Sequence, residues 1–327
     1  MTSFGPHGDG SPLRGHTALV TGSSRGLGLL IARELADRGC RVMLCARGER
    51  QLVAAEAALR ARGADVASLA CDVTAPETPQ RLLDAVTERL GSLDVLVNNA
   101  GVIQVGALEA MGEQQYRDAM ETMFFAPLRL TLAALPGLRE RPGARVVNIG
   151  SIGGRVAPPH LLPYAAAKFA VTGWSEGLRT ELAAQGISVT TVLPGLMRTG
   201  SHTAALFHGD AAHEYAWFAP GASLPLVSMN AERAARAIVR AAERRRPELV
   251  LTPLAKTAVR AHGIAPATTT RLMSVAARML PGAGTDAERE GVTGAGARER
   301  LGSRVVDRLT TLGDRAADHF NQRTHPG

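Results

Sequence analysis

The chain has 327 residues, of which 45% are apolar and 4% aromatic, and its net charge is +7. This length fits one large domain, or one domain with an extension. The cations are spread along the chain without interleaved aromatics, which argues against nucleic-acid binding and fits a phosphorylated cofactor better. The three cysteines match no metal or disulfide spacing, and no apolar run is long enough to span a membrane. We therefore expect a cytoplasmic protein without a bound metal.

After a Gly- and Pro-rich N-terminal tail, residues 1–13, short apolar runs alternate with amphipathic segments up to residue 252. Such alternation predicts an α/β fold, a doubly wound, Rossmann-like parallel sheet of about seven strands. The predicted strands are 17–21, 41–46, 65–71, 93–97, 144–149, 188–193 and 249–251. The predicted helices are 26–38, 49–62, 80–90, 113–138, 164–184 and 231–244. Pro127 predicts that the fourth helix is kinked or split.

Residues 253–327 break this rhythm and predict a helical C-terminal extension. One apolar stripe is formed by Leu272, Val275, Ala276, Met279 and Leu280. A disordered-looking stretch, 283–296, precedes a last helix whose stripe is Leu301, Val305, Leu309, Leu312, Ala316 and Phe320. Two interpretations stay open: the helices pack on the main domain or across a dimer, or, since Arg271 and Arg278 flank the first stripe, they contact a membrane surface.

A glycine-rich turn follows the first strand and opens an apolar-periodic helix. Its sequence is Thr21-Gly22-Ser23-Ser24-Arg25-Gly26-Leu27-Gly28. Glycines let the backbone turn sharply and approach a pyrophosphate, while the helix N-terminus offers unpaired N–H groups. The turn predicts cofactor binding by Gly22, Ser24, Arg25, Gly26, Leu27 and Gly28.

The second strand indicates which nicotinamide cofactor is used. An NAD site commonly has an acidic residue at the end of this strand to hold the ribose 2′-hydroxyl. Here the strand ends at Cys45-Ala46-Arg47 without one. Arg47 and Arg25 can each bind a 2′-phosphate, although either can also be an ordinary surface residue. The sequence thus favours NADP(H) over NAD(H).

Tyr164 and Lys168 stand four residues apart on a predicted helix, and Ser151 lies thirteen residues before the tyrosine. Residues i and i+4 share one face of a helix. An ammonium group beside a phenol favours the phenolate, which would lower the pKa of Tyr164 toward the range of a general acid/base. The three residues are predicted to be catalytic.

With these motifs in place, the chain resembles the short-chain dehydrogenase/reductase family over about residues 14–252. The motifs that carry the resemblance are, in order, Thr21–Gly28, Asp72-Val73, Asn98-Asn99-Ala100-Gly101, Ser151, Tyr164-x-x-x-Lys168 and Pro194-Gly195 followed by Thr199. The resemblance implies that Tyr164 exchanges a proton with the substrate oxygen while hydride moves to or from the nicotinamide C4. Ser151 would hydrogen-bond that oxygen, and Lys168 would bind the nicotinamide ribose and lower the pKa of Tyr164.

The same resemblance implies the remaining cofactor contacts. Asp72 would hold the adenine, and Asn98 and Gly101 would border the cofactor cleft, while Pro194 and Thr199 would position the nicotinamide. Their motif neighbours Val73, Ala100 and Gly195 complete the predicted cofactor-binding set. The family also implies a homodimer or homotetramer that assembles through the helices around 113–138 and 164–184.

One position departs from the family pattern. Members usually carry an asparagine in the helix before the serine strand, as part of a water-linked proton relay to the lysine, and the alignment places Met123 there. Methionine accepts hydrogen bonds only weakly and donates none. Our hypothesis is that the relay runs through water or backbone carbonyls, which would reduce activity or change its pH dependence.

Residues 196–228 predict a lid over the substrate. They contain Leu206-Phe207 and Tyr215–Phe218, which suit a hydrophobic carbonyl compound, unless the segment only packs on the C-terminal helices. His202, His208 and His213 are interpreted as polar lid residues. The predicted function is an NADP(H)-dependent oxidoreductase that interconverts a hydrophobic carbonyl and its alcohol. The alternative is a non-catalytic or weakly active NADP(H)-binding relative of the family.

Overall fold

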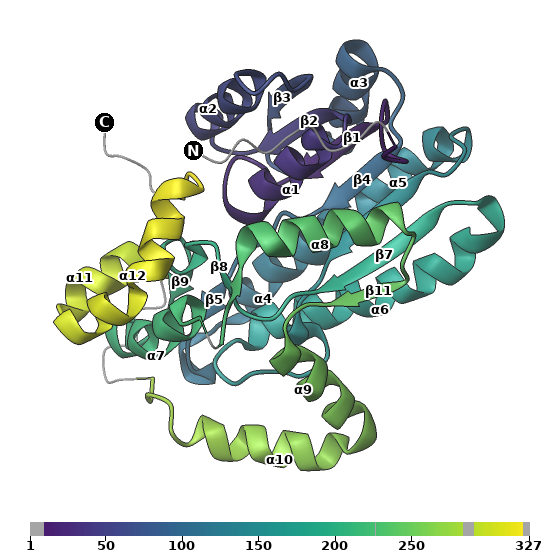
Figure 1. Ribbon diagram of the computed structural model, residues 1–327. Helices are drawn as coiled ribbons and strands as arrows, with labels where there is room; N and C mark the ends of the chain where they lie inside the picture. Colours follow the sequence, from purple (N-terminus) through teal and green to yellow (C-terminus); the bar gives the residue numbers. More distant parts are fainter. Residues whose placement is uncertain (1–9, 226, 284–290, 323–327) are drawn as a thin grey trace.

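The structure is a computed structural model that describes residues 10–225, 227–283 and 291–322. Its centre is a seven-stranded sheet with the strand order β11-β7-β6-β4-β1-β2-β3 (Figure 1). All the neighbouring strands of this sheet pair in parallel. The strands are β1 (Thr17–Thr21), β2 (Arg41–Ala46), β3 (Val66–Ala70), β4 (Val95–Asn98), β6 (Arg145–Ile149), β7 (Ser188–Leu193) and β11 (Glu248–Val250). The predicted doubly wound fold is confirmed.

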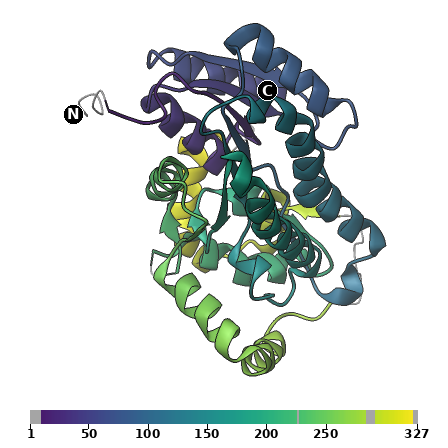
Figure 2. The ribbon, with the colours of Figure 1, turned by 90° about the vertical axis from the view of Figure 1, so that its right-hand side faces the viewer.

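Helices cover both faces of the sheet and bury one apolar core on each. The first core lies under α1 (Gly26–Asp37), α2 (Glu49–Arg60) and α8 (Ala231–Glu243). The second lies under α3 (Thr78–Leu90), α5 (Ala126–Arg139) and α6 (Leu162–Leu182). Figures 1 and 2 show these two layers with the sheet between them. Because both faces are buried, the strands read as nearly continuous apolar runs.

The strand order reverses between β1 and β4, which lie side by side. In a doubly wound sheet, ligands bind in the crevice outside the carboxyl ends of the strands at such a reversal. The glycine turn follows β1, and the Asn-Asn-Ala-Gly motif follows β4. The topology therefore brings two distant motifs to one edge of the sheet.

The long helix predicted over 113–138 is split, as Pro127 suggested. α4 (Glu113–Met120) leads into a π-helical turn, Glu121–Phe125, before α5 begins. Pro127 lies in the first turn of α5, where its missing N–H breaks no helical hydrogen bond. The break is thus placed in the turn before the proline, and Met123 lies within it.

The N-terminal boundary needs a correction. We assigned residues 1–13 to a tail, and residues 1–9 lie outside the described part of the chain. Leu13, however, is fully buried in the first core, and Ser11 donates a hydrogen bond to Glu243. The folded chain thus starts before residue 14.

After β7 the chain forms the lid region and the extension. The lid contains β8 (Met197–Arg198), β9 (Leu206–Phe207), α7 (Ala211–Ser223) and β10 (Met229–Asn230). The extension contains α9 (Pro253–Ile264), α10 (Pro266–Ala277), β12 (Val292–Thr293), α11 (Gly294–Leu301) and α12 (Arg304–His319). A small sheet joins the two, with β9 between β12 and β5 (Gln104–Val105). Short 3₁₀ turns at 108–110, 152–154, 183–185 and 201–203 complete the elements.

Two expectations for the extension are wrong in part. Part of the stretch 283–296, residues 284–290, lies outside the described chain, but Val292 and Thr293 form a strand and Gly294 begins a helix. Of the expected apolar stripe, Phe320 packs in the first core, whereas Val305, Leu309 and Leu312 are exposed on the single chain. The buried face of α12 is Thr310, Gly313, Asp314 and Ala317.

Small residues explain this orientation of α12. A Cβ at Gly200 would overlap the backbone of Ala317, and one at Gly313 would overlap the Ser223 side chain. Close backbone approach between α12 and the lid therefore replaces contact through the larger side chains. In the described residues no helix has both the length and the apolar character that crossing a membrane requires.

Candidate active site

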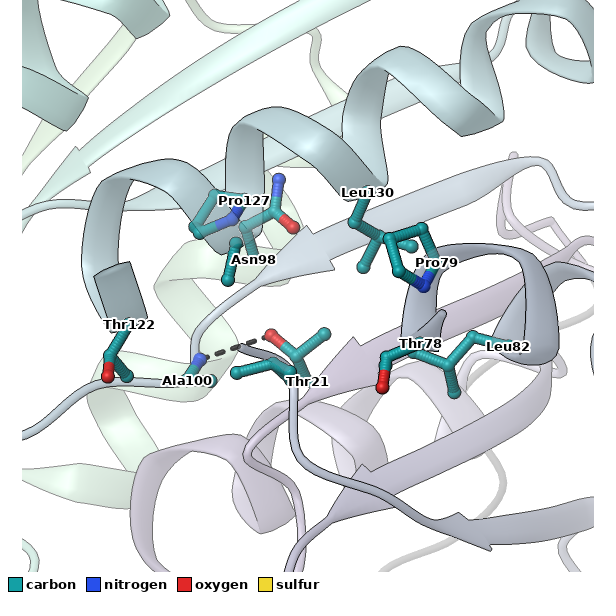
Figure 3. Close-up of a pocket in the computed structure, with 11 residues that line it drawn as sticks. Thr21, Thr78, Pro79, Leu82, Asn98, Ala100, Thr122, Pro127 and Leu130 are labelled. Atoms are coloured by element: carbon teal, nitrogen blue, oxygen red, sulfur yellow. Dashed lines mark hydrogen bonds between the residues drawn. The ribbon is translucent and has the colours of Figure 1, made fainter. Parts of the chain in front are cut away.

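Hydrogen bonds between side chains and backbone tie the glycine turn to the loop after β4. Thr21 Oγ1 accepts a hydrogen bond from the Asn99 N–H at 3.0 Å. It accepts another from the Ala100 N–H at 3.1 Å, drawn as a dashed line in Figure 3. The Asn99 amide donates to the carbonyl of Thr21 at 2.9 Å. Gly22 has φ of +66°, and a Cβ on it would lie 2.9 Å from Ala100 Cα. The turn thus needs glycine both for its backbone conformation and for this close approach.

Asn98 does not border the cleft with its side chain, contrary to the implied role. The side chain is 3% exposed and donates hydrogen bonds to Thr131 and Asn148. Asn98 also lines a small cavity with Thr21, Ala100 and Leu130 (Figure 3). The cavity has a volume of about 10 Å³, which is room for one water and too little for a nicotinamide. The Asn98 side chain therefore joins the end of β4 to β6 and α5.

Two arginines meet beside the adenine motif. Arg25, just before α1, is partly buried, and its pKa is lowered by burial and by the nearby charge of Arg47. Arg47 follows β2, and its guanidinium lies 4.0 Å from the Asp72 carboxylate. Burial opposes ionisation of Asp72, but hydrogen bonds from Thr74 and the Arg47 charge outweigh it and lower the pKa. Two neighbouring cations at the ends of β1 and β2 favour the binding of an anion.

The three predicted catalytic residues come from two neighbouring elements. Ser151 follows β6 and caps a 3₁₀ turn, where its hydroxyl accepts the Gly153 N–H at 3.0 Å. Tyr164 and Lys168 lie one turn apart at the start of α6. The Lys168 ammonium lies 5.7 Å from the centre of the Tyr164 ring and donates to the Ile149 carbonyl at 2.7 Å.

A glycine lets α6 approach the serine turn. A Cβ on Gly154 would overlap the Lys168 backbone carbonyl. The backbone of the serine turn therefore packs directly on the first turns of α6. A Cβ on Gly153 would lie 3.4 Å from both Ser151 Oγ and the Tyr164 ring, so the two side chains face the same place. The structure thus brings together the serine, the tyrosine and the lysine.

The pKa values differ from the expectation that Lys168 controls Tyr164. Burial raises the pKa of Tyr164 above its ordinary value, and the nearby Ser151 hydroxyl offsets this only in part. Burial also lowers the pKa of Lys168 to about 8. Near neutral pH the phenol is therefore protonated and can donate a proton, which suits the reduction of a carbonyl.

Met123 lies at the position of the usual asparagine and fills apolar space. It is 1% exposed and packs on Ala119 and Ala167 beside the Tyr164 ring. A Cβ on Gly101 would come within 3.4 Å of the Met123 sulfur, so this predicted cleft residue faces the π-helical turn. π-helical turns occur often at functional sites.

The predicted nicotinamide-side residues follow β7. The Pro194 carbonyl accepts the Ile152 N–H at 2.8 Å, which ties this loop to the serine turn. Gly195 donates to the Leu251 carbonyl, and a Cβ on it would lie 2.6 Å from Thr252 Oγ1. Thr199 is 4% exposed and accepts the Ser201 N–H. Pro194 is thereby joined to the loop that carries Ser151.

Most aromatic side chains of the lid do not line a substrate cleft. Phe207, Tyr215 and Phe218 are buried in a third core with Leu161 and Ala297, where α7 meets the extension. The packing interpretation is therefore correct for these three. Ile103, Trp217 and Tyr164 are partly buried at the border of this core.

The histidines of the lid have separate partners. His202 lies 3.4 Å from Asp314, and His213 lies 2.7 Å from Asp210. Within the described chain no three His, Cys, Asp or Glu side chains group as a metal site would require.

Sequence reasoning missed a buried carboxylate beside the catalytic helix. Glu214 is 1% exposed and accepts hydrogen bonds from the Trp217 indole and from His160, each at 2.6 Å. His160 precedes α6 and Glu214 lies on α7, so the bond fixes the lid to the loop before Tyr164. Burial raises the pKa of Glu214, while the bonds from Trp217 and His160 oppose the change. Only the proximity of His160 to Tyr164 in the sequence hinted at this.

Comparison with known proteins identifies the family. The short chain dehydrogenase profile matches residues 16–207, more than half of the chain. The chain belongs to the short-chain dehydrogenase/reductase family. It is therefore an oxidoreductase of the kind that acts on C=O and CH–OH groups.

Relatives in sequence and structure agree with this assignment. The 3-oxoacyl-[acyl-carrier-protein] reductase FabG of Vibrio cholerae is 38% identical over 187 residues, which are 57% of this chain and 75% of that protein. A short-chain dehydrogenase from Streptomyces avermitilis has a TM-score of 0.68 at 34% identity, with 81% of this chain and 98% of that chain covered. A single-residue variant of the actinorhodin polyketide ketoreductase, solved with NADPH, has a TM-score of 0.64 at 33% identity, with 72% and 95% covered.

Proposed function

We propose that this protein is an NADPH-dependent reductase of a hydrophobic ketone or aldehyde. The observation that carries the proposal is the meeting of Ser151, Tyr164 and Lys168 on α6 and the neighbouring serine turn. A carbonyl reductase needs a proton donor, a partner for the carbonyl oxygen and a cation within one small site. These three side chains supply them.

The arginine pair supports NADP(H) as the cofactor. The residues that would hold it are the glycine turn, Arg25, Arg47 and Asp72 with Val73, and Pro194 with Gly195 and Thr199 near the nicotinamide. A 2′-phosphate would relieve the repulsion between Arg25 and Arg47, which now lowers the pKa of Arg25. The actinorhodin relative was solved with NADPH, which agrees with this choice.

Tyr164, Ser151 and Lys168 each have one role in the proposed reduction. When bound, the nicotinamide would supply a hydride to the carbonyl carbon. Tyr164 gives its phenolic proton to the carbonyl oxygen as the alcohol forms, and Ser151 donates a hydrogen bond to the same oxygen. Lys168 keeps a positive charge beside the phenolate that is left, and the carbonyl of Ile149 fixes the ammonium.

The proton supply would run through water molecules held by backbone carbonyls. Met123 provides no side-chain donor, whereas Lys168 already donates to a backbone carbonyl, and the π-helical turn leaves the regular helical hydrogen-bond pattern next to it. Met123→Asn tests this idea, because an added amide should change the rate or its pH profile. An unchanged rate and profile would refute it.

An apolar substrate is supported by the surroundings of Tyr164. Ile103 and Trp217 lie at the border of the third core, as does the phenol itself, and Val102 and Met120 lie on its other side. FabG and the actinorhodin ketoreductase are named for ketone reduction on 3-oxoacyl and polyketide chains. We therefore place a 3-oxoacyl thioester or a similar ketone with an apolar chain first among the substrates.

An NADPH-oxidation screen tests the proposal. Wild type and Tyr164→Phe are compared on ketones and aldehydes of graded size and polarity, with a 3-oxoacyl thioester included. We expect the highest kcat/KM for apolar ketones, and activities lower by about 10²–10⁴-fold in Tyr164→Phe. NADPH binding without turnover of any carbonyl would favour the non-catalytic alternative, and a preference for small charged carbonyls would refute the apolar substrate.

A homodimer or homotetramer is part of the proposal. α6, which packs on α4, carries the exposed apolar residues Leu162 and Phe169, and Phe125 is exposed in the π-helical turn between α4 and α5. Burial of such side chains between copies is the usual reason for family members to associate. Sedimentation of wild type against Phe169→Asp measures this, and an unchanged mass would exclude α6 from the interface.

We also propose that α9 and α10, the hairpin of residues 253–279, contacts an anionic membrane surface. The hairpin projects from the sheet in both ribbon views (Figures 1 and 2). Its exposed apolar residues include Ile264, Leu272, Val275 and Met279. Residues 253–283 carry four Lys and Arg and no acidic residue. Two such hairpins would repel one another through their cations. An anionic membrane would instead attract the cations through its headgroups and bury the apolar face at the acyl boundary.

Vesicle co-sedimentation tests the hairpin. Wild type should sediment with phosphatidylglycerol-containing vesicles and not with pure phosphatidylcholine, and Leu272→Asp with Met279→Asp should abolish this. Val305→Asp with Leu309→Asp is the matched control, because those residues are also exposed, on α12. If the hairpin variants bind vesicles normally but lower the oligomeric mass, a second copy covers the hairpin and the membrane idea is wrong.

A further inference from the structure

The end of the extension lies against the cofactor turn. The Phe320 carbonyl accepts the Gly26 N–H at 2.9 Å. The Asn321 amide donates to the Ser24 carbonyl at 2.9 Å and to the Gln51 carbonyl, on α2, at 3.1 Å. We call residues 320–322 the C-terminal strap. The strap joins the turn after β1, which carries Arg25, to α2, which begins two residues after Arg47.

The strap is held in a defined conformation. Asn321 has φ of +58°, a region that asparagine enters more readily than most residues. The Gln322 N–H donates to the Ala317 carbonyl at 2.9 Å, so the strap closes the end of α12. Ala317 in turn lies against Gly200. The position of Gln322 is therefore fixed by contacts on both sides.

The Gln322 side chain points into the start of α1. It is 9% exposed, and its amide nitrogen occupies the place that a Cβ on Gly26 would take. From that same place the Thr199 Cβ is 3.9 Å away. Among the residues that the structure describes, the Gln322 amide has no hydrogen-bond partner. The amide is not fully enclosed, since neither of its atoms is among the completely buried side-chain atoms without a partner in the described chain. An incoming group can therefore reach it and supply that partner.

The start of α1 also has backbone N–H groups that no acceptor in the described chain uses. The Gly26 N–H is taken by Phe320, but Leu27 and Gly28 have no acceptor for their N–H groups in the described part of the chain. Free N–H groups at a helix N-terminus attract an anion. The Gln322 amide points to the same place, between Gly26 and Thr199. It can donate a further hydrogen bond to such an anion.

We propose that Gln322 is a cofactor-binding residue whose amide donates to the pyrophosphate of NADP(H), together with the N–H groups of Leu27 and Gly28. This rests on the proposed use of NADP(H) and deepens it, because it assigns part of the cofactor site to the extension. The family profile ends at residue 207, so this contact comes from outside the matched region.

Equilibrium binding to the full chain tests the proposal. Gln322→Leu keeps the size of the side chain and removes the amide, and it should weaken NADPH binding about 10-fold or more, the usual effect of losing a hydrogen bond to a charged group. Binding of 2′-AMP, which has the 2′-phosphate without a pyrophosphate, should stay unchanged. Gln185→Leu, at an exposed position beside Arg139, is the matched control and should bind both as wild type does.

The outcomes separate the alternatives. Equal NADPH affinity for Gln322→Leu and wild type overturns the proposal, and tighter binding overturns it too, because the strap would then obstruct the site. An equal loss for NADPH and 2′-AMP means that Gln322 only shapes the turn, which also contradicts a pyrophosphate contact. Gln322→Ala repeats the test in case the leucine misfolds. If wild type itself fails to bind NADPH, the proposed cofactor is wrong, which is a separate result.

Discussion

Replacing Lys168 with methionine should stabilise the protein in a pH-dependent way. The ammonium is 5% exposed, and no carboxylate in the described chain forms an ion pair with it. Burial lowers its pKa from 10.5 to about 8. A difference of about 2.5 pKa units corresponds to about 3 kcal/mol that folding must supply below pH 8, where the lysine is charged in both states. Methionine removes this cost and loses the hydrogen bond to Ile149, which offsets about 1.5–3 kcal/mol at most.

The sign follows from the lowered pKa. Between about pH 8 and pH 10.5 the unfolded lysine holds more protons than the folded one, so the stability of wild type rises with pH in this window. The difference in the free energy of unfolding, Lys168→Met minus wild type, should therefore fall by about 2 kcal/mol between pH 7 and pH 10.

Denaturant unfolding of the cofactor-free protein at both pH values measures this difference. The other titrating groups are common to both proteins and cancel. Lys256→Met, which removes the only other lysine at an exposed place on α9, should give a difference that does not change with pH. A constant difference for Lys168→Met as well would refute the view that burial penalises the catalytic ammonium.

Three further predictions concern the site and its support. Tyr164→Phe should lower kcat about 10²–10⁴-fold, the usual contribution of a general acid, and leave the NADPH dissociation constant unchanged; strong residual activity in steady-state assays would assign the proton to another group. Arg25→Ala and Arg47→Ala should each raise the dissociation constant for NADPH several-fold without weakening NADH, as titrations of both cofactors can measure, and equal losses for both would exclude a 2′-phosphate contact. Gly200→Ala should lower stability by about 2–4 kcal/mol, because φ is +80° and the new Cβ overlaps Ala317. Gly302→Ala, with φ of +56° and open space, should cost only about 1 kcal/mol, and comparable melting shifts for the two would contradict close packing of α12 on the lid.

Local patterns in the sequence were sufficient to predict the fold and to single out the three candidate catalytic residues. Apolar runs and turn glycines predicted β1, α1 and the glycine turn. The helical spacing of Tyr164 and Lys168 predicted that they share one face of a helix. The Tyr164 pKa was not predictable, because it depends on burial by residues from other elements. The charge of Lys168 was expected to dominate, and burial dominates instead.

The extension shows where periodicity misleads. Hydrophobicity favoured Val305, Leu309 and Leu312 as the contact face of α12, but these residues are exposed. The contact depends on Gly313 and Ala317 meeting Gly200 and Ser223, and such a match of small residues is invisible before both helices are placed. Gln322 was missed for the same reason, because it lies far from Gly26 in the sequence.

These contacts argue that the extension is part of the catalytic unit. Removing residues after 252 would leave Gly200 without Ala317, the Gly26 N–H without Phe320, and the third core without Ala297. A loss of activity or of vesicle binding in such a truncation would therefore report a damaged lid and cofactor turn. Point variants on the exposed hairpin and at the Gln322 amide avoid this difficulty, because they leave the contacts of Ala317, Phe320 and Ala297 in place. The role of the extension must be measured with the whole chain.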